Sequence, residues 1–208
     1  MKIAVISETS AADKNKDILQ ALENTDHSIV NCGMKFKGEN PELQYIHTGF
    51  MAGLLLNSKR VDYVIGGCGT GQGFLNSVMQ YPGVFCGHIL TPLDAWLFTQ
   101  INGGNCISLA LNQGYGWAGD VNLDFLIQRL FSVQSGCGYP AQRQIPQGES
   151  RKKLADISTI AHRSFGEIIS KLPDNIVNPV LRYPGFLDTL DITTIENSEL
   201  KNALSDRI

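Results

Sequence analysis

The sequence has no run of apolar residues long enough to cross a membrane, no surplus of positive charge and no paired cysteine motif. A helical membrane span needs about 20 mostly apolar residues. A net charge of −3 gives no electrostatic footprint for a nucleic acid. The five cysteines are scattered, so they indicate neither a disulfide framework nor a zinc site. We therefore expect a cytoplasmic protein with reduced thiols that binds neither nucleic acid nor membrane.

Apolar runs that read as strands alternate five times with stretches of helical spacing. The predicted strands are 2–6, 28–32, 61–65, 83–89 and 106–111. The predicted helices are 12–23, 42–58, 74–80, 93–101 and 118–131. This alternation predicts an α/β fold, a three-layer Rossmann-like architecture in which helices cover both faces of a five-stranded parallel sheet.

The pattern changes after residue 132. A turn-rich link leads to a predicted helix over residues 151–171, and the tail beyond Leu172 contains three prolines and ends in a polar run. We expect residues 1–145 to form the α/β domain. Residues 146–208 are expected to be a C-terminal helical extension that packs on this domain or on a partner subunit.

The most informative stretch follows the third predicted strand and reads Gly66-Gly67-Cys68-Gly69-Thr70-Gly71-Gln72-Gly73. Its five glycines let a ligand approach the backbone. When a strand is followed by a turn and then by the N-terminus of a helix, the free N–H groups point at the ligand, which is typically an anion or a developing oxyanion. The stretch is not a Walker loop, because no Gly-Lys-Ser/Thr follows, and Phe74 breaks the dinucleotide fingerprint. Thiols at helix N-termini ionise readily, so Cys68 is a candidate base or nucleophile, with plain phosphate binding as the alternative.

Other polar residues are expected at the same edge of the sheet, because ligands of parallel sheets bind at the carboxyl ends of the strands. Glu8 follows the first strand, where it can bind a substrate hydroxyl, act as a second acid–base group, or cap the next helix. His88 lies near the end of the fourth strand and is either a site residue or a core histidine. His47, on the second helix, reads as a surface or interface residue. A cysteine hydrolase would need a His–acid pair that the sequence does not assign to Cys68.

The strand and Cys68-Gly69-Thr70-Gly71-x-Gly73 together resemble the signature of the ribose-5-phosphate isomerase B and galactose-6-phosphate isomerase family. The resemblance extends over about residues 1–145. It includes the opening Met1-Lys2-Ile3-Ala4, the turn Tyr81-Pro82-Gly83-Val84, the segment from Asn102 to Leu109 and the segment from Gly136 to Arg143.

The resemblance implies aldose–ketose isomerisation through a cis-enediolate, without a metal or an organic cofactor. In this family the cysteine matching Cys68 moves the proton between neighbouring carbons, and Thr70 can relay a proton between substrate oxygens. Asn102 matches an asparagine that helps to hold the enediolate. The hole for the enediolate oxygen is shaped by the turn glycines, Gly69, Gly71 and Gly73. The resemblance also implies a homodimer, or a tetramer, with active sites shared between subunits.

Departures from the family pattern bear on the substrate. Glu8-Thr9 stands where the family has Asp-His, Ile101 replaces a ring-opening histidine, and Asn112 replaces a phosphate-binding arginine. Arg143 is the only counterpart of two tail arginines. A phosphodianion site needs arginines or a dense set of donors.

We therefore expect an open-chain sugar acid such as 4-deoxy-5-hexosulose uronate, because a carboxylate needs fewer cationic partners than a phosphate. The residues expected to bind it, besides the turn glycines, are Glu8, Thr9, His88, Asn112 and Arg143. The alternatives are a ribose-5-phosphate or galactose-6-phosphate substrate, or a catalytically incomplete sugar-binding partner subunit.

Overall fold

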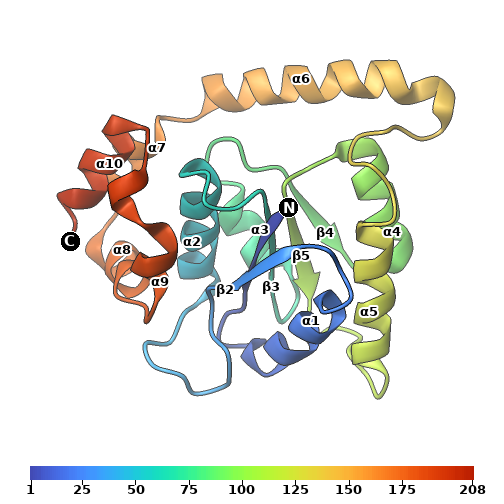
Figure 1. Ribbon diagram of the computed structural model, residues 1–208, viewed down its shortest axis with the longest axis horizontal. Helices are drawn as coiled ribbons and strands as arrows, with labels where there is room; N and C mark the ends of the chain where they lie inside the picture. Colours follow the sequence, from blue (N-terminus) through green and yellow to red (C-terminus); the bar gives the residue numbers. More distant parts are fainter.

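A computed structural model describes all 208 residues (Figure 1). Its centre is one parallel sheet with the strand order β2-β1-β3-β5-β4. The strands are β1 (Lys2–Ile6), β2 (Ser28–Asn31), β3 (Tyr63–Cys68), β4 (Cys86–Ile89) and β5 (Cys106–Ala110). The predicted fold class is confirmed, because all four strand pairings are parallel and helices cover both faces.

Side chains that alternate along the strands pack into two cores, one on each face of the sheet. On β1, Ile3 and Val5 pack in the core beneath α1 (Asn15–Leu22), α4 (Pro92–Leu97) and α5 (Gly119–Leu130). The intervening Ala4 and Ile6 pack on the other face, beneath α2 (Tyr45–Asn57) and α3 (Gln72–Val78). This period of two makes β1 a buried central strand.

Strand β3 is longer than the sequence predicted and runs through both of its glycines to Cys68. Gly66 leaves room for the Phe74 ring, and Gly67 lies against the Leu109 carbonyl of β5. Both glycines are therefore required by close packing within the sheet, and the turn proper begins only at Gly69.

The helix before β5 also differs from its prediction. Thr91 caps α4, and the α-helix ends at Leu97 and continues as one π-helical turn, η2 (Phe98–Asn102). Gly103 ends this turn with a φ of +52°, a conformation that glycine adopts without strain. Asn102 is thus the last residue of an irregular helix.

The prediction of a single helix over residues 151–171 is wrong. The structure has two helices, α6 (Gln144–Ala161) and α7 (Phe165–Lys171). The chain is extended at His162, and the Ser164 hydroxyl accepts a hydrogen bond of 3.2 Å from the Glu167 N–H to cap α7. Three further helices follow: α8 (Asp174–Leu181), α9 (Phe186–Leu190) and α10 (Ser198–Ser205). Short 3₁₀ turns cover Ala12–Lys14 (η1), Ala141–Arg143 (η3) and Ile192–Thr194 (η4).

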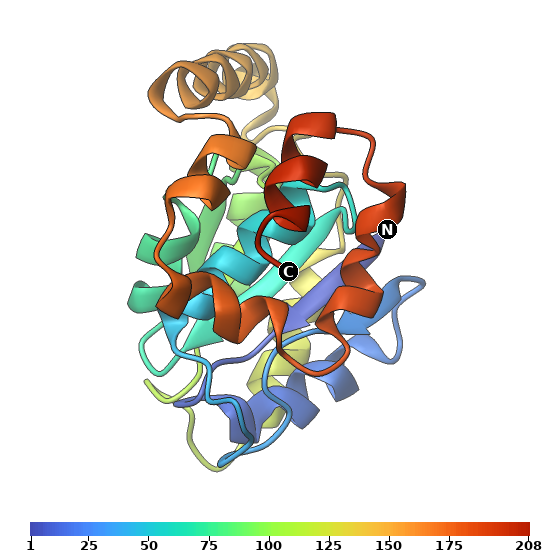
Figure 2. The same cartoon turned by 90° about the vertical axis from the view of Figure 1, so that its left-hand side faces the viewer.

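Helices α7 to α10 share the core beneath α2, as Figures 1 and 2 show from two sides. The Phe50 ring of α2 stacks on Phe165, with ring centroids 6.2 Å apart. Helix α6 instead lies across the outside of the molecule, and Ser158 is its only buried residue. None of the helices is both long and apolar enough to cross a bilayer.

Candidate active site

The glycine turn is held through its carbonyl oxygens. The Gly69 carbonyl accepts hydrogen bonds from the N–H groups of Asn112 (2.9 Å) and Gln113 (3.1 Å), just beyond β5. The Thr70 carbonyl accepts one from His88 Nε2 at 2.9 Å, and the Gly71 carbonyl accepts one from the Ser108 hydroxyl. Because three successive carbonyls are bound by β4, β5 and the loop after β5, the orientation of the intervening peptide groups is fixed.

Three backbone N–H groups of the turn have no acceptor in the chain. They belong to Thr70, Gly73 and Phe74. Gly71 precedes α3 and has a φ of +74°. The first N–H of the helix, from Gln72, donates to the Thr70 hydroxyl over 3.4 Å, while the next two, from Gly73 and Phe74, are unpaired. The Gly69 N–H is already used, because it donates to Ser10 Oγ over 2.8 Å. These three free donors lie within six residues of Cys68, which is the last residue of β3.

The turn after β1 is tied to the glycine turn through Ser10. The Ser10 hydroxyl and its N–H (2.9 Å) both donate to one oxygen of Glu8, and the Ser10 carbonyl accepts from Asn112 Nδ2 over 2.7 Å. The Thr9 N–H donates to the Leu43 carbonyl at 2.9 Å. Neither η1 nor α1 has a side-chain cap, so none of Glu8, Thr9 and Ser10 caps the next helix. Ser10 was missed as a site residue because its role depends on three separate loops.

Glu8 is a carboxylic acid almost removed from solvent, with 3% of its surface exposed. Burial raises the pKa of its carboxyl group, and the charge of Glu42 acts in the same direction. Hydrogen bonds from Ser10 and Ala11 oppose this shift by stabilising the carboxylate.

The structure therefore brings most of the predicted site residues to the carboxyl edge of the sheet. Glu8 is connected to the glycine turn through Ser10, and Thr9 lies next to Glu8 in the chain. Asn112 and His88 bind the backbone of the same loops. His88 carries its proton on Nε2 here, since a carbonyl only accepts. No group of three or more His, Cys, Asp or Glu side chains is arranged to hold a metal ion.

Asn102 and Arg143 do not join this group within one chain. Cys68 pairs with Ala110 at the carboxyl end of β5, whereas Asn102 precedes Cys106 at its amino end. Four residues of strand separate the two ends by about 13 Å. Both Asn102 and Arg143 line a cavity of about 600 Å³ beneath α6.

Arg151 of α6 connects the end of η2, where Asn102 lies, to the segment that precedes Arg143. Its guanidinium donates to the Ile101 carbonyl over 2.7 Å and to the Gly136 carbonyl over 2.8 Å. The position of Asn102 relative to the segment before Arg143 is thus fixed within the chain, away from Cys68.

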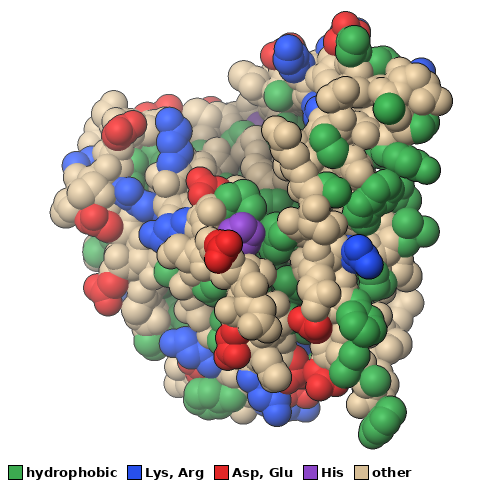
Figure 3. Space-filling view, turned by 45° about the vertical axis from the view of Figure 1, so that its right-hand side comes forward, with side chains coloured by type: hydrophobic (Ala, Val, Ile, Leu, Met, Phe, Trp, Pro, Cys, Tyr) green, Lys and Arg blue, Asp and Glu red, His purple; other side chains and the backbone are tan.

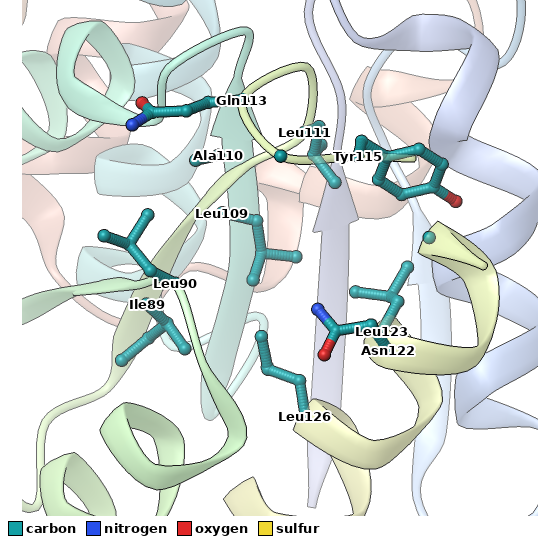
Figure 4. A pocket seen from close by; sticks show the side chains of 12 residues that line it. Ile89, Leu90, Leu109, Ala110, Leu111, Gln113, Tyr115, Asn122, Leu123 and Leu126 are labelled. Carbon is teal, nitrogen blue, oxygen red and sulfur yellow. The ribbon is translucent and has the colours of Figure 1, made fainter. Parts of the chain in front are cut away.

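A smaller cavity of about 270 Å³ lies between the ends of β4 and β5 and the start of α5 (Figure 4). Figure 4 shows a mostly apolar lining, with Leu109, Leu111 and Leu126 among its walls and Gln113 and Asn122 as amides. Leu109 and Leu111 belong to the core on the α5 side, while Cys68 belongs to the core on the α2 side. Cys68 therefore has no part in this cavity.

Comparison with known proteins identifies relatives over the whole chain. The model of the Ribose/Galactose Isomerase family matches residues 3–127. The structure of a 4-deoxy-L-threo-5-hexosulose-uronate ketol-isomerase, complexed with a tartrate, is 33% identical, with a TM-score of 0.92 over 100% of this chain and 99% of that one. The structure of a ribose-5-phosphate isomerase from Vibrio parahaemolyticus is 36% identical, with a TM-score of 0.93 and the same coverage.

A more distant structure shows how much of the fold is shared. A ribose-5-phosphate isomerase from Thermotoga maritima is 20% identical and has a TM-score of 0.57, over 71% of this chain and 97% of that one. A comparison with curated protein sequences gives no match. Since the family model covers more than half of the chain and two relatives above 30% identity span all of it, the protein belongs to the ribose/galactose isomerase family and is an aldose–ketose isomerase.

Proposed function

We propose that Cys68 is the base of the isomerisation and that the substrate is an open-chain sugar acid such as 4-deoxy-L-threo-5-hexosulose uronate. The observation that carries this proposal is the position of Cys68 at the end of β3, directly before a turn with three unpaired N–H groups. A base and a set of oxyanion donors are the two groups that an enediolate mechanism requires.

The proposed reaction moves one proton between neighbouring carbons. The Cys68 thiolate takes the proton from the carbon next to the carbonyl, and the freed electron pair forms the C=C bond of a cis-enediolate. The carbonyl electron pair moves to oxygen, where N–H groups of Thr70, Gly73 and Phe74 can stabilise the charge. The Thr70 hydroxyl transfers a proton between the two oxygens, and the Cys68 thiol returns its proton to the former carbonyl carbon.

The charges around the turn favour a carboxylate over a phosphate. No Lys or Arg side chain hydrogen-bonds to residues 8–10 or 68–73, and none of the four ion pairs involves Glu8. Asn112 uses its amide to bind the Ser10 carbonyl. One arginine, Arg143, is then the candidate partner for a substrate anion, and one bidentate arginine matches a single carboxylate. The full-length likeness to a uronate ketol-isomerase supports the same substrate.

A phosphorylated sugar is the second candidate. It is favoured by the equally complete likeness to the Vibrio ribose-5-phosphate isomerase. Such a substrate would require further phosphate donors besides Arg143, which the backbone N–H groups of the glycine turn would have to supply.

We also propose a dimer in which each active site combines Cys68 of one subunit with Asn102 and Arg143 of the other. The two groups lie at opposite ends of the sheet in one chain, so a second copy is the direct way to unite them. The apolar stripe of α6, formed by Leu154, Ile157 and Ile160, is exposed in the single chain. Figure 3 shows further hydrophobic side chains gathered below α6 on the face of α4 and α5, where Leu93, Val121 and Phe125 are exposed. Apolar surface of this kind marks interaction sites.

Proton exchange in deuterated water tests the reaction and the substrate together. Purified protein is incubated with 4-deoxy-L-threo-5-hexosulose uronate, ribose 5-phosphate or galactose 6-phosphate and followed by NMR, with Cys68→Ala as the control. Isomerisation of the uronate alone, with deuterium incorporation that requires Cys68, is the expected result. Turnover of a phosphosugar would favour the second candidate substrate, a phosphorylated sugar. Turnover that persists in Cys68→Ala would refute Cys68 as the base.

A further inference from the structure

The first turn of α2 lies against the glycine turn. A side-chain carbon built on Gly73 would stand 3.0 Å from the Tyr45 ring, so the ring covers this glycine. Tyr45 is 45% exposed, and its hydroxyl donates to no acceptor in the chain. Because α2 connects two parallel strands, its first residue, Tyr45, stands at the carboxyl edge of the sheet, where Cys68 also lies. Gly73, whose N–H is free, and a half-exposed aromatic ring thus lie side by side.

His47 fixes the conformation of this first turn. Its Nδ1 accepts the Gln44 N–H over 3.0 Å, which caps α2, and its Nε2 lies 3.0 Å from the Asn175 carbonyl. A carbonyl only accepts, so the proton of His47 is on Nε2 and both ring nitrogens are paired. His47 is buried, and it joins the start of α2 to α8 of the C-terminal segment.

The C-terminal segment contacts the same wall at a second point. The Tyr183 hydroxyl, just after α8, donates to the Gly33 carbonyl over 3.2 Å. Gly33 begins the stretch that leads to α2, and Leu43 in this stretch accepts the Thr9 N–H. Figure 2 shows α8 and α9 packed over α2 from the outside. The first turn of α2 and the stretch that begins at Gly33 are therefore both bound by residues of the C-terminal segment. This segment lies beyond residue 127, where the match to the family model ends.

We propose that Tyr45 forms a wall of the substrate site above the glycine turn, and that His47, bound to Asn175 of the C-terminal segment, holds it there. This inference rests on the proposed function, since it takes the glycine turn as the place where substrate binds. The ring face packs against the C–H groups of a polyhydroxy chain, and the hydroxyl hydrogen-bonds to one of its oxygens. Tyr45 is the substrate-contacting residue and His47 a positioning residue.

Arg60 provides a matched control. It lies beyond the other end of α2 and ties that end to the C-terminal segment, through the carbonyls of Leu190 (2.6 Å) and Asp191 (2.9 Å) and the Thr194 hydroxyl (2.7 Å). His47 and Arg60 therefore join the same two parts of the molecule, but only His47 lies at the end of α2 whose first residue, Tyr45, contacts the glycine turn. A purely structural role would make the two substitutions equivalent.

The test compares His47→Leu, His47→Gln and Arg60→Met. We expect His47→Leu and Arg60→Met both to lower the melting temperature, and only His47→Leu to lower kcat/KM, by about tenfold and mainly through KM. His47→Gln should restore most of the loss, because a glutamine amide also accepts and donates. Tyr45→Leu should cost about the same factor, and the double variant with His47→Leu no more than either alone.

Binding without turnover separates this inference from the proposed function. The uronate is titrated by calorimetry into Cys68→Ala protein, alone and with His47→Leu or Arg60→Met added, and affinity should fall with His47→Leu only. Wild-type turnover with equal effects of the two substitutions would overturn the inference and leave the proposed function standing. If His47→Leu weakens binding, Arg60→Met does not, and the wild type shows no turnover, the proposed role of Tyr45 and His47 would be supported and the proposed isomerisation contradicted. Neither binding nor turnover of the uronate or ribose 5-phosphate would contradict both.

Discussion

Glu8 shows how a single buried carboxyl group links the site to pH. Burial, the larger cause, and the charge of Glu42 raise its pKa above the ordinary value near 4.5. A carboxyl group with a raised pKa binds its proton more tightly in the folded than in the unfolded chain. Its contribution to stability is therefore complete below the ordinary pKa and is lost as the pH rises through the raised pKa. Above that range, the folded protein carries an unfavourable buried charge.

Glu8→Gln removes this charge and keeps an acceptor for the Ser10 N–H. We expect the variant to melt a few degrees above the wild type at pH 8, and the difference to disappear at pH 4, where Glu8 of the wild type is protonated. Thermal melts at the two pH values measure this. Glu23→Gln, at an exposed position, should show no such difference. A variant that melts below the wild type at pH 8 would mean that the Ser10 hydrogen bonds outweigh the burial of the charge.

At the residue scale, the sequence predicted groups whose roles are local. Cys68 could be proposed as a base because strand, turn and helix start follow one another along the chain, whereas Thr70 was assigned by the family resemblance. Tyr45 could not, because the predicted helix started at residue 42 and placed it a turn inside. In the structure α2 starts at Tyr45 itself. His47 was interpreted as a surface or interface residue, but it is buried, and its partner, Asn175, lies 128 residues away in the sequence.

At the element scale, the glycine turn depends on one left-handed residue. Gly71 has a φ of +74°, and a side-chain carbon there would stand 2.6 Å from His88 Nε2. Gly38 has a φ of +84° but nothing within 4 Å. Both positions require a positive φ, but only Gly71 lies against a side chain of the turn, the His88 ring that binds the Thr70 carbonyl.

Gly71→Ala and Gly38→Ala should therefore separate strain from function. Each should lose about 1–2 kcal/mol of folding free energy, because alanine is disfavoured in the left-handed region. Only Gly71→Ala should also lose activity, by about a hundredfold in kcat, since displacing His88 would move the N–H groups that we propose as oxyanion donors. Chemical denaturation and steady-state kinetics on the same samples provide both numbers. Equal kinetics for the two variants would show that the turn tolerates a shift of His88.

Element boundaries were the weaker part of the sequence-based prediction, and the C-terminal helices show why. Apolar residues keep a helical spacing from Ile157 through Ile160 to Phe165, so nothing in the pattern marks the break at His162. In the structure, Ile160 is 85% exposed and Phe165 is buried against Phe50. The periodicity is the same on both sides of the break, but the partners differ, and only tertiary packing distinguishes them.

At the scale of the whole molecule, the C-terminal segment is part of the core. Helices α7 to α10 and their connections contribute twelve of the 31 buried residues in the core beneath α2. Among these, Phe186 is 1% exposed, whereas Phe36 in the loop before α2 is 58% exposed. Removing the two rings therefore has different consequences for stability.

Phe186→Ala should destabilise the protein by about 3–5 kcal/mol, the usual cost of a buried phenylalanine truncated to alanine. Phe36→Ala, the control, should change the free energy of unfolding by less than about 0.5 kcal/mol. Urea denaturation followed by circular dichroism measures both. A small effect of Phe186→Ala would mean that the C-terminal segment is only loosely attached and that the remaining core folds without it.

The separation of Asn102 and Arg143 from Cys68 is also a property of the whole molecule. From the sequence, all three were assigned to one site by resemblance, and the order of strands alone does not say whether one chain or two would supply them. The structure places Asn102 before the amino end of β5, and Cys68 beside its carboxyl end. The proposed dimer resolves this, because each of its sites would take one set of residues from each subunit.

Mixing two inactive variants tests the shared site directly. Cys68→Ala and Asn102→Ala should each abolish or strongly reduce turnover as homodimers, because every site lacks one group. In a mixture that has been unfolded and refolded together, heterodimers contain one site with both defects and one with neither, so about a quarter of the wild-type activity should return. Cys68→Ala mixed with Thr70→Val is the control, because both residues belong to the same turn and no intact site can form. Failure of the first mixture to regain activity, with heterodimers demonstrated by mass spectrometry, would place all catalytic groups within one chain and exclude Asn102 of a partner from the reaction.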